Sequence, residues 1–275
     1  MQIVFAATAC VSIAAIAVIC VFLLANGLPA IREIGLSNLL TGTVWKPLSG
    51  IYGLLPMIVG SLYVTAGALV VGVPLGILTA VYLARFCPAR LYAVLKPGVD
   101  LMAGIPSVIY GFFGLVVIVP WVRTNLGGQG FGVLTASLLL GMMILPSIID
   151  VSESALRAVP DRYFEGSLAL GATKERSAFS VVLPAARSGI LAGVVLGIGR
   201  AIGETMAVIM VAGNQPVIPA DILSGVRTLT ANIALEIGYA TDLHRGALIA
   251  TAVVLFVFGL LVDLAVAGLK RRMPS

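Results

Sequence analysis

Residues 199–208 read GRAIGETMAV and place two ionisable side chains, Arg200 and Glu204, inside a long apolar segment. Ionisable residues within a membrane-spanning segment are costly to bury, and by default they mark a functional site. Because four residues separate the two, a continuous helix would present both on the same face. The guanidinium of Arg200 is permanently charged and offers a planar set of donors that matches an oxyanion. These properties predict a transport pathway for an anion, and a small oxyanion fits best.

Glu204 has two tasks on this hypothesis. It pairs with Arg200 when no substrate is present, and it weakens the net attraction so that a passing anion is released. The alternative is a buried ion pair that only fixes helix packing, although a hydrophobic pair would pack at lower cost than two desolvated ions. Ser107 and Tyr110, at the start of another apolar segment, either donate hydroxyl groups to the same oxyanion or hydrogen-bond to a neighbouring helix.

The elements that must position these residues are membrane-spanning helices. Of 275 residues, 60% are hydrophobic and only 11% are charged, whereas a soluble domain carries about 25% charged residues. About 20 apolar residues span the hydrocarbon as a helix, and the apolar runs here are too long and uniform for barrel strands. The predicted spans are residues 4–27, 55–84, 102–122, 131–149, 189–213 and 246–268. The sequence therefore predicts an all-α integral membrane protein with six transmembrane helices.

Small residues precede the buried arginine at helical spacing. Gly189, Gly193 and Gly197 recur every four residues, near the stripe that holds Arg200. Such a stripe allows neighbouring helices to approach closely. It also leaves room for a substrate to pass.

Lysine and arginine residues gather on one side of the predicted spans. Eleven of them lie in segments 85–101 and 150–188 and in the C-terminal tail, against five on the opposite side. Cytoplasmic loops carry such an excess. We therefore expect a multi-pass protein of the bacterial plasma (inner) membrane, with both termini in the cytoplasm and with segments 28–54 and 214–245 facing outward.

Two outward stretches have the composition of short helices, residues 30–40 and 228–237. Each either rests on the membrane surface or forms a docking surface for an external partner. Trp45, Tyr52 and Trp121 suit anchoring at the membrane interface, where aromatic residues gather.

No metal site or cofactor is expected from this sequence. Cys10, Cys20 and Cys87 have neither metal-binding nor disulfide spacing, and His244 is the only histidine. The N-terminal apolar run is too long for a cleaved signal peptide and lacks its basic flank, so we interpret it as the first transmembrane helix. The basic residues are not interleaved with aromatic ones, which argues against nucleic-acid binding.

The long inward segment is the most patterned part of the chain. It predicts a short helix over residues 162–170, with Asp161 as the N-cap. Gly171 suits the positive φ of a turn, and Thr173 suits the cap of a second helix that runs to about residue 182. Two short helices joined by a tight turn move as one body, so a force applied to this hairpin reaches the spans on both sides.

The spacing in this hairpin resembles the EAA motif of bacterial ABC importer permeases, EAA-x3-G-x9-I-x-LP. Gly166 and Ser167 stand where the motif has two alanines, and Val181 stands where it has isoleucine. The resemblance implies a coupling hairpin that seats in a cleft of a separate ATPase subunit, against the alternative of an ordinary structured loop. The implied coupling residues are Glu165, Gly166, Ser167, Leu170, Gly171, Ala172, Leu183 and Pro184.

The hairpin does not bind nucleotide itself. A phosphate-binding loop needs Lys and then Ser or Thr directly after its second glycine, so that the lysine reaches the phosphates. Here Ala172 follows Gly171. ATP hydrolysis is therefore expected on a partner subunit, and the chain is not expected to be an enzyme.

Longer stretches resemble the PstC-type permease subunits of phosphate ABC importers, over roughly residues 45–265. The PstA-type paralogues also carry an RA-x-GET stretch but typically continue with Ala-Pro, where this chain has Met206, Ala207 and Val208. The stretches that carry the resemblance are WKPLSGIYGLLPMIVGSLYVT (45–65), AGIPSVIYGFFGLVVIVP (103–120), MMILPSIIDVSESAL (142–156), SLALGATK (167–174) and VVLPAARSGILAGVVLGIGRAIGETMAV (181–208).

This resemblance implies a type I ABC importer permease of MetI-like fold that moves inorganic phosphate by alternating access. It implies three kinds of protein partner besides the lipid membrane and phosphate itself: a paralogous six-span permease of the PstA type, two copies of a PstB-type ATPase, and an external PstS-type phosphate-binding protein. Residues 1–54 then hold the first transmembrane helix and an outer interfacial loop, 55–268 the permease core, and 269–275 a basic cytoplasmic tail.

Other functions remain open at this point. The chain is alternatively the PstA-type subunit or a permease for another oxyanion. A secondary transporter or channel would use Arg200 and Glu204 as a gate, but the EAA-like hairpin argues against it. A membrane scaffold would use the same two residues only for packing.

Overall fold

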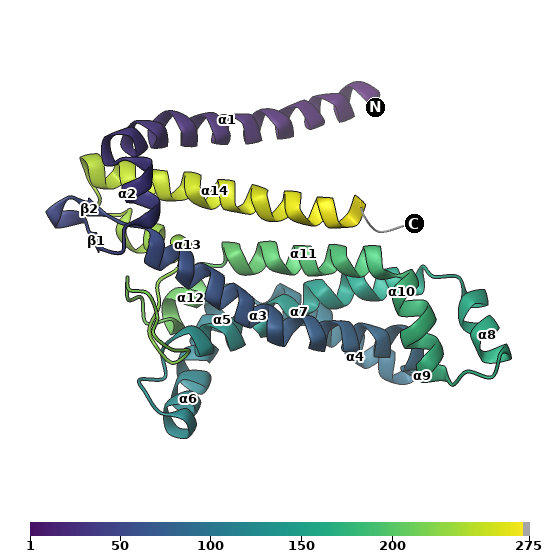
Figure 1. Ribbon diagram of the computed structural model, residues 1–275. Coiled ribbons are helices and arrows are strands. Elements are labelled where there is room, and N and C mark those ends of the chain that lie inside the picture. Colours follow the sequence, from purple (N-terminus) through teal and green to yellow (C-terminus); the bar gives the residue numbers. More distant parts are fainter. Residues whose placement is uncertain (272–275) are drawn as a thin grey trace.

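The computed structural model describes residues 1–271, and residues 272–275 of the predicted basic tail lie outside the described part. Long helices run roughly side by side from one end of the molecule to the other, and shorter elements close both ends (Figure 1). Five stretches within the described chain are long and apolar enough to cross a membrane: Val4–Ile34, Leu55–Phe86, Ser107–Leu126, Val133–Arg157 and Asp242–Ala265. A bent pair, Lys174–Ala185 with Arg187–Gly203, adds a sixth if it is counted as one span. The all-α, multi-span expectation is confirmed.

The five candidate spans, and the helices α11 and α12 at the predicted fifth span, comprise the following elements. They are α1 (Gln2–Ile34); α3 (Leu55–Val81) with the π-helical η2 (Tyr82–Phe86); α5 (Ser107–Phe113), π-helical η3 (Gly114–Ile118) and α6 (Val119–Leu126); α7 (Val133–Arg157); α11 (Arg187–Gly203) with α12 (Met206–Val211); and α14 (Asp242–Arg271).

The third span starts later than predicted. The segment expected to be a loop, 85–101, is largely the helix α4 (Ala89–Gly104), and the span itself begins at Ser107. Ile105 takes an extended backbone conformation before Pro106, because the proline ring disfavours helical dihedrals in the residue that precedes it. Helix α4 has 16 residues, which is shorter than the about 20 residues that cross the hydrocarbon as a helix.

Helices α3 and α7 form the centre of the molecule, and α11 packs against α7. A Cβ added at Gly72 would lie 2.8 Å from Ile144, so only a glycine permits this approach of α3 to α7. On α11, a Cβ at Gly197 would lie 3.0 Å from Ile148 of α7. Close helix approach through the glycine stripe is thus confirmed. The idea that the stripe leaves a passage is wrong, because α7 fills the space.

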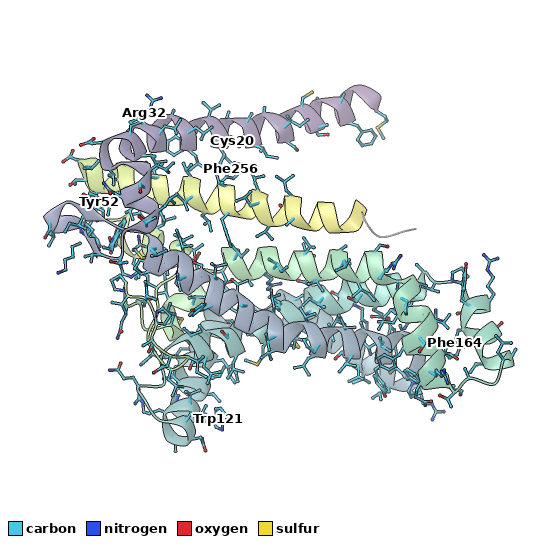
Figure 2. The ribbon with its side chains drawn as sticks, in the orientation of Figure 1. Cys20, Arg32, Tyr52, Trp121, Phe164 and Phe256 are labelled. Carbon is cyan, nitrogen blue, oxygen red and sulfur yellow. The ribbon has the colours of Figure 1, made fainter. Side chains whose placement is uncertain are left out.

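The two ends of the molecule carry different structural elements. The start of α1 and the end of α14 lie on the side of the hairpin helix α8 (Asp161–Ala169), and the small elements between α1 and α3 lie at the opposite end (Figure 1). Phe164 marks the first end, and Tyr52 and Trp121 mark the other (Figure 2). This matches the relative sidedness predicted from the lysine and arginine residues.

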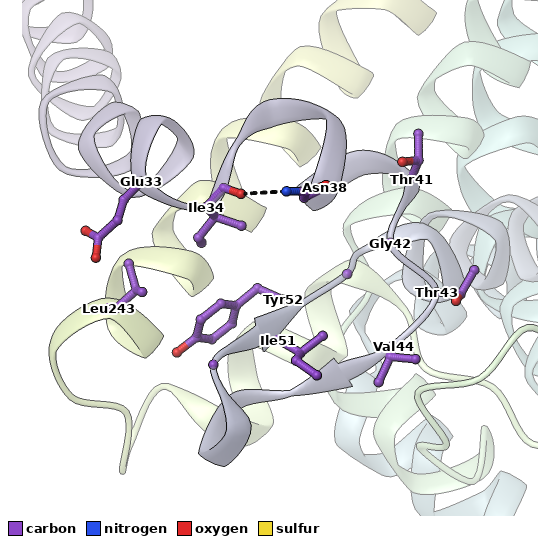
Figure 3. Close-up of a pocket in the computed structure, with 12 residues that line it drawn as sticks. Glu33, Ile34, Asn38, Thr41, Gly42, Thr43, Val44, Ile51, Tyr52 and Leu243 are labelled. Carbon is purple, nitrogen blue, oxygen red and sulfur yellow. Dashed lines mark hydrogen bonds between the residues drawn. The ribbon is translucent and has the colours of Figure 1, made fainter.

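The end of the molecule that lies between α1 and α3 is named the outer end, after the sidedness that the sequence predicts. It is more compact than the sequence indicates. After α1, Gly35 takes a φ of 87° and α2 (Leu36–Thr41) follows, so the predicted helix over 30–40 is two helices. Strands β1 (Trp45–Lys46) and β2 (Ile51–Tyr52) pair antiparallel around the short 3-10 helix η1 (Pro47–Ser49). A cavity of about 580 Å³ lies between this β-hairpin and the C-terminal end of α1 (Figure 3).

Two expectations for the outer end are corrected. Helix α13 (Leu229–Glu236) confirms the helix expected at 228–237, but it is buried against α3, α12 and α14 and does not rest on a membrane surface. Trp45 and Tyr52 are also buried and contact each other edge to face at 5.6 Å, so they are core residues and not interfacial anchors. Trp121 is exposed.

Candidate functional site

The predicted fifth span is broken at its ionisable residues. Helix α11 ends at Gly203, Glu204 takes an extended conformation, and α12 begins at Met206. One oxygen of the Glu204 carboxylate accepts hydrogen bonds from the backbone N–H groups of Thr205 and Ala207, both at 3.1 Å. The side chain thus satisfies N–H groups that lack a partner at a helix start. The expectation that one helix presents Arg200 and Glu204 on a common face is wrong.

Arg200 lies half-buried on the last turn of α11. Across residues 1–271 it has neither a hydrogen bond nor an ion pair. A cation is favoured at the C-terminal end of a helix by the helix dipole. The carboxylate that was expected to neutralise it serves α12 instead. A packing ion pair between Arg200 and Glu204 therefore has no support in this geometry.

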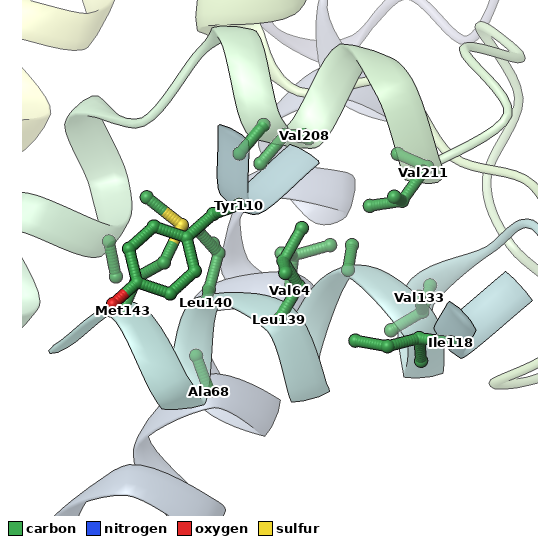
Figure 4. Close-up of a cluster of buried hydrophobic side chains, with 14 of the residues drawn as sticks. Val64, Ala68, Tyr110, Ile118, Val133, Leu139, Leu140, Met143, Val208 and Val211 are labelled. Atoms are coloured by element: carbon green, nitrogen blue, oxygen red, sulfur yellow. The ribbon is translucent and has the colours of Figure 1, made fainter. Parts of the chain in front are cut away.

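The predicted hydroxyl donors lie on α5, next to the break. Tyr110 is buried, and its hydroxyl donates to the carbonyl of Met102 at 2.9 Å. That bond joins α4 to α5 across the Pro106 break, so the phenolic proton is already used within the chain. Ser107 is the first residue of α5 and is half-buried. Tyr110 and Val208 of α12 lie in the same hydrophobic cluster (Figure 4), which places the break against α5.

The break between α11 and α12 also accepts a hydrogen bond from a residue that the sequence analysis did not identify. Thr230 of α13 donates its hydroxyl to the backbone carbonyl of Glu204 at 3.0 Å. The only local signal is a pair of threonines, Thr228 and Thr230, ahead of a short apolar run. Thr228 also caps α13 by accepting from the N–H of Ala231 at 3.2 Å.

The predicted hairpin is present at the end of the molecule where α1 begins (Figure 1). Gly171 takes a φ of 85°, and the Thr173 hydroxyl accepts from the N–H of Arg176 at 3.3 Å, so both turn and second cap are confirmed. The second arm is α9 (Lys174–Ser177), the π-helical η4 (Ala178–Val182) and α10 (Leu183–Ala185). Asp161 is not an N-cap: Pro160 takes that position, and the Asp161 carboxylate instead pairs with Arg85 at 2.6 Å.

The predicted coupling residues lie mainly on the exposed tip of this hairpin. Leu170 is 91% exposed, which is unusual for a leucine in a structured turn. Glu165, Gly166 and Gly171 are exposed, and a Cβ at either glycine would meet nothing within 4 Å. Ala172, Ser167, Leu183 and Pro184 range from half-buried to exposed nearer the arms. An apolar, small-residue surface of this kind is suited to contact with another protein.

Two arginines fasten the base of the hairpin to the spans. Arg85 at the end of the second span donates to the carbonyls of Leu156 and Val159, at 2.9 and 3.0 Å. Arg157 at the end of α7 donates in return to the carbonyl of Leu83 at 2.9 Å. An apolar cluster that includes Val81, Leu156, Val182 and Ile190 lies beneath them. Movement of the hairpin is therefore tied to the second and fourth spans.

Helix α4 is held by a lysine. Lys96 forms ion pairs with Asp100 on its own helix, at 2.9 Å, and with Asp150 on α7. Burial alone would lower the pKa of Lys96, but hydrogen bonds with Asp150 and Asp100 outweigh it and raise that pKa. Lys96 therefore stays charged and keeps α4 against α7.

A second polar cluster closes the outer end. The buried Glu236 carboxylate accepts from Arg227 at 2.6 Å and from Trp45 at 2.9 Å, and it lies 2.9 Å from the His244 ring nitrogen. The three partners come from β1, the loop before α13, and α14. Within the described residues, no group of three or more histidine, cysteine, aspartate or glutamate side chains is arranged to hold a metal ion.

Comparison with known proteins identifies relatives over most of the chain. Residues 72–274 match the family described as "Binding-protein-dependent transport system inner membrane component". The "Probable ABC transporter permease protein YqgH" of Bacillus subtilis (strain 168) is 38% identical over 274 residues, which cover 96% of this chain and 89% of that protein. The "Phosphate transport system permease protein PstC" of Mesorhizobium japonicum is 36% identical over 270 residues, covering 90% and 82%.

A solved structure has the same fold. The MetNI methionine ABC transporter in an inward-facing conformation matches 84% of this chain and 100% of its own chain, with a TM-score of 0.63 at 22% identity. At that identity the likeness concerns the fold, and it confirms the expected MetI-like permease architecture.

Proposed function

The chain belongs to the family of binding-protein-dependent transport system inner membrane components, and from this premise we propose that it is the PstC-type permease subunit of an ATP-driven importer of inorganic phosphate. Membership makes it a membrane-spanning ABC transporter permease that is not itself an enzyme. Relatives named as phosphate permeases, among them PstC of Haemophilus influenzae at 33% identity, support phosphate as the cargo.

One observation supports the choice of an anion: within residues 1–271, Arg200 at the break of the fifth span has neither a hydrogen bond nor an ion pair. An arginine left without a counter-charge in a partly buried site is unfavourable, and its donors match a tetrahedral oxyanion. Glu204 is held by α12 and does not occupy those donors. A passing phosphate therefore finds the guanidinium unoccupied. The nearby carboxylate keeps the net attraction weak enough for release.

The ends of the molecule accommodate the proposed partners. The exposed tip around Leu170 takes a PstB-type ATPase, and two such subunits serve this chain and a PstA-type permease. A PstS-type binding protein delivers phosphate at the opposite end, where the β-hairpin and α13 lie. On this proposal the hairpin and both chain ends face the cytoplasm of a bacterial cell (Figure 1).

On this proposal, alternating access depends on how the hairpin is fastened. Closure of the ATPases pushes α8, and the Arg85 and Arg157 contacts carry that movement into the second and fourth spans. Helix α11 packs on the fourth span through its glycines, so it moves with it and carries Arg200. The coupling hairpin and the anion site are thereby joined through α7.

The test is ATP-dependent phosphate uptake by cells that carry Arg200→Ala, Arg200→Lys, or Arg200→Ala combined with Glu204→Ala. Complex assembly is measured in parallel by co-purification, and the exposed Arg90→Ala serves as the matched control. We expect all three site variants to assemble and to lose uptake. Restored uptake in the double variant would assign Arg200 to packing. Competition by sulfate, molybdate or arsenate tests whether phosphate is the preferred oxyanion.

A further inference from the structure

Helix α13 reaches the break in the fifth span from the outer end. Its first turn is buried: Thr228, Leu229 and Thr230 are each less than a tenth exposed. The N–H of Leu229 donates to the hydroxyl of Ser61 on α3 at 3.0 Å, which fixes this turn to the second span. The Thr230 hydroxyl then bridges to the carbonyl of Glu204. The start of α13 therefore connects a central helix to the two residues that separate α11 from α12.

The direction of the hydrogen bonds at this point is determined by chemistry. A carbonyl oxygen only accepts, so Thr230 must give its single proton to Glu204. The hydroxyls of Thr228 and Thr230 lie 3.1 Å apart, and Thr228 must therefore donate to Thr230. Thr228 in turn accepts from the N–H of Ala231. A chain of hydrogen bonds with one donor direction therefore runs from the backbone of α13 to the backbone carbonyl of Glu204. Each hydroxyl in it accepts one hydrogen bond and donates one.

The Glu204 carbonyl needs such a donor. It lies just past the end of α11, where carbonyl groups have no partner within the helix. The backbone here is extended, with ψ of 130°, and the adjacent Gly203 adds freedom because glycine restricts the chain least. Without an external bond, the end of α11 that carries Arg200 would be loosely held.

We propose that Thr230 is a positioning residue for the substrate site. Its hydroxyl fixes the backbone of Glu204 and thereby holds the last turn of α11, so that the guanidinium of Arg200 meets the oxyanion in one orientation. This inference rests on the proposed function of Arg200. Thr230 does not contact the substrate; it acts through Glu204.

The first arm of the test is phosphate uptake by complexes with Thr230→Val, which keeps the shape and removes the hydroxyl, and with Thr230→Ser, which keeps the hydroxyl. Thr251→Val is the matched control, because Thr251 is equally buried but donates only to Ala247 within its own helix. Loss of one net hydrogen bond predicts a fall in uptake of roughly threefold to tenfold for Thr230→Val. Thr230→Ser and Thr251→Val should retain uptake.

The second arm measures the backbone directly. A Cβ at Gly203 would meet nothing within 4 Å, so Gly203→Cys, with the three native cysteines changed to serine, introduces a thiol at the end of α11. Its rate of labelling by a water-soluble maleimide in the purified complex should rise with Thr230→Val and not with Thr230→Ser. A purely packing role for the threonine would leave this difference absent.

The outcomes separate the two proposals. Unchanged uptake and unchanged labelling in Thr230→Val, alongside lost uptake in Arg200→Ala, overturns the role of Thr230 alone. Retained uptake in Arg200→Ala overturns the proposed function instead. If Thr230→Val fails to assemble, Thr230→Ala replaces it, and equal uptake and labelling in the alanine and serine variants contradicts the inference.

Discussion

Replacing Glu236 with alanine tests what holds the outer end together. The carboxylate is 8% exposed and joins three segments that are far apart in sequence. Its partners are Arg227 at 2.6 Å, Trp45 at 2.9 Å and His244 at 2.9 Å. The substitution removes all three interactions at once and leaves the Arg227 side chain, only 15% exposed, without its counter-charge.

These contacts allow an estimate of how much folding free energy the Glu236→Ala substitution removes. Removing one member of a buried ion pair destabilises a protein by about 3–5 kcal/mol. Arg227 keeps hydrogen bonds to the carbonyl of Asn214 and the side chain of Asn232, which favours the lower end of that range. The indole N–H of Trp45 loses its acceptor, at about 1–3 kcal/mol if no water replaces it. A total near 4 kcal/mol corresponds to a fall in melting temperature of roughly 10 °C for a chain of this size.

The assay is thermal unfolding of the purified complex, compared with Glu33→Ala. Glu33 is exposed on α1, and exposed substitutions usually change stability by less than about 0.5 kcal/mol. A Glu236→Ala complex that melts at the same temperature as Glu33→Ala would refute the reasoning. The double variant Arg227→Ala with Glu236→Ala should cost less than the sum of the two single changes, because neither charge is then left unpaired.

Three further changes follow from the same contacts. Arg85→Gln removes the hairpin clamp and should lower phosphate uptake per ATP hydrolysed severalfold, whereas the exposed Arg90→Gln should not; both quantities are measured in proteoliposomes. Leu170→Glu alters a side chain that makes no core contact, so the chain should still insert and fold but lose the co-purifying ATPase. Gly197→Leu forces α11 away from α7 and should destabilise the complex by about 1–3 kcal/mol, while Gly199→Ala, which points into open space, should leave its melting temperature unchanged.

Features encoded by neighbouring residues were predictable from the sequence. The hairpin follows from Gly171 and Thr173, because a positive φ and a side-chain cap depend on local chemistry alone. The spans follow from hydropathy, because a bilayer requires about 20 apolar residues for each helix. Helix α4 escaped prediction because Lys96 and its acidic partners make the segment look like a polar loop, while their pairing is what holds it as a helix on α7.

Features that depend on distant residues were not predictable. Glu204 is a good helix former, and the apolar run continues on both sides of it, so nothing local marks an interruption. The break is stabilised by Thr230, 26 residues later, and the outer end by Trp45 and Glu236, which are 191 residues apart. Asp161 was mistaken for a cap because its real partner, Arg85, lies 76 residues earlier.

The interruption of the fifth span bears on the depth of the proposed anion site. Non-helical backbone within a membrane is tolerated only where protein or a water-filled cavity surrounds it, and here α5, α7 and α13 supply that surrounding. A continuous helix would bring Arg200 and Glu204 together and neutralise the cation. The break instead commits the carboxylate to the N–H groups of α12, and among residues 1–271 it leaves the guanidinium without a hydrogen bond or ion pair. On the proposed function, the guanidinium gains a direct counter-charge only when an anion, or a group from the second permease, reaches it.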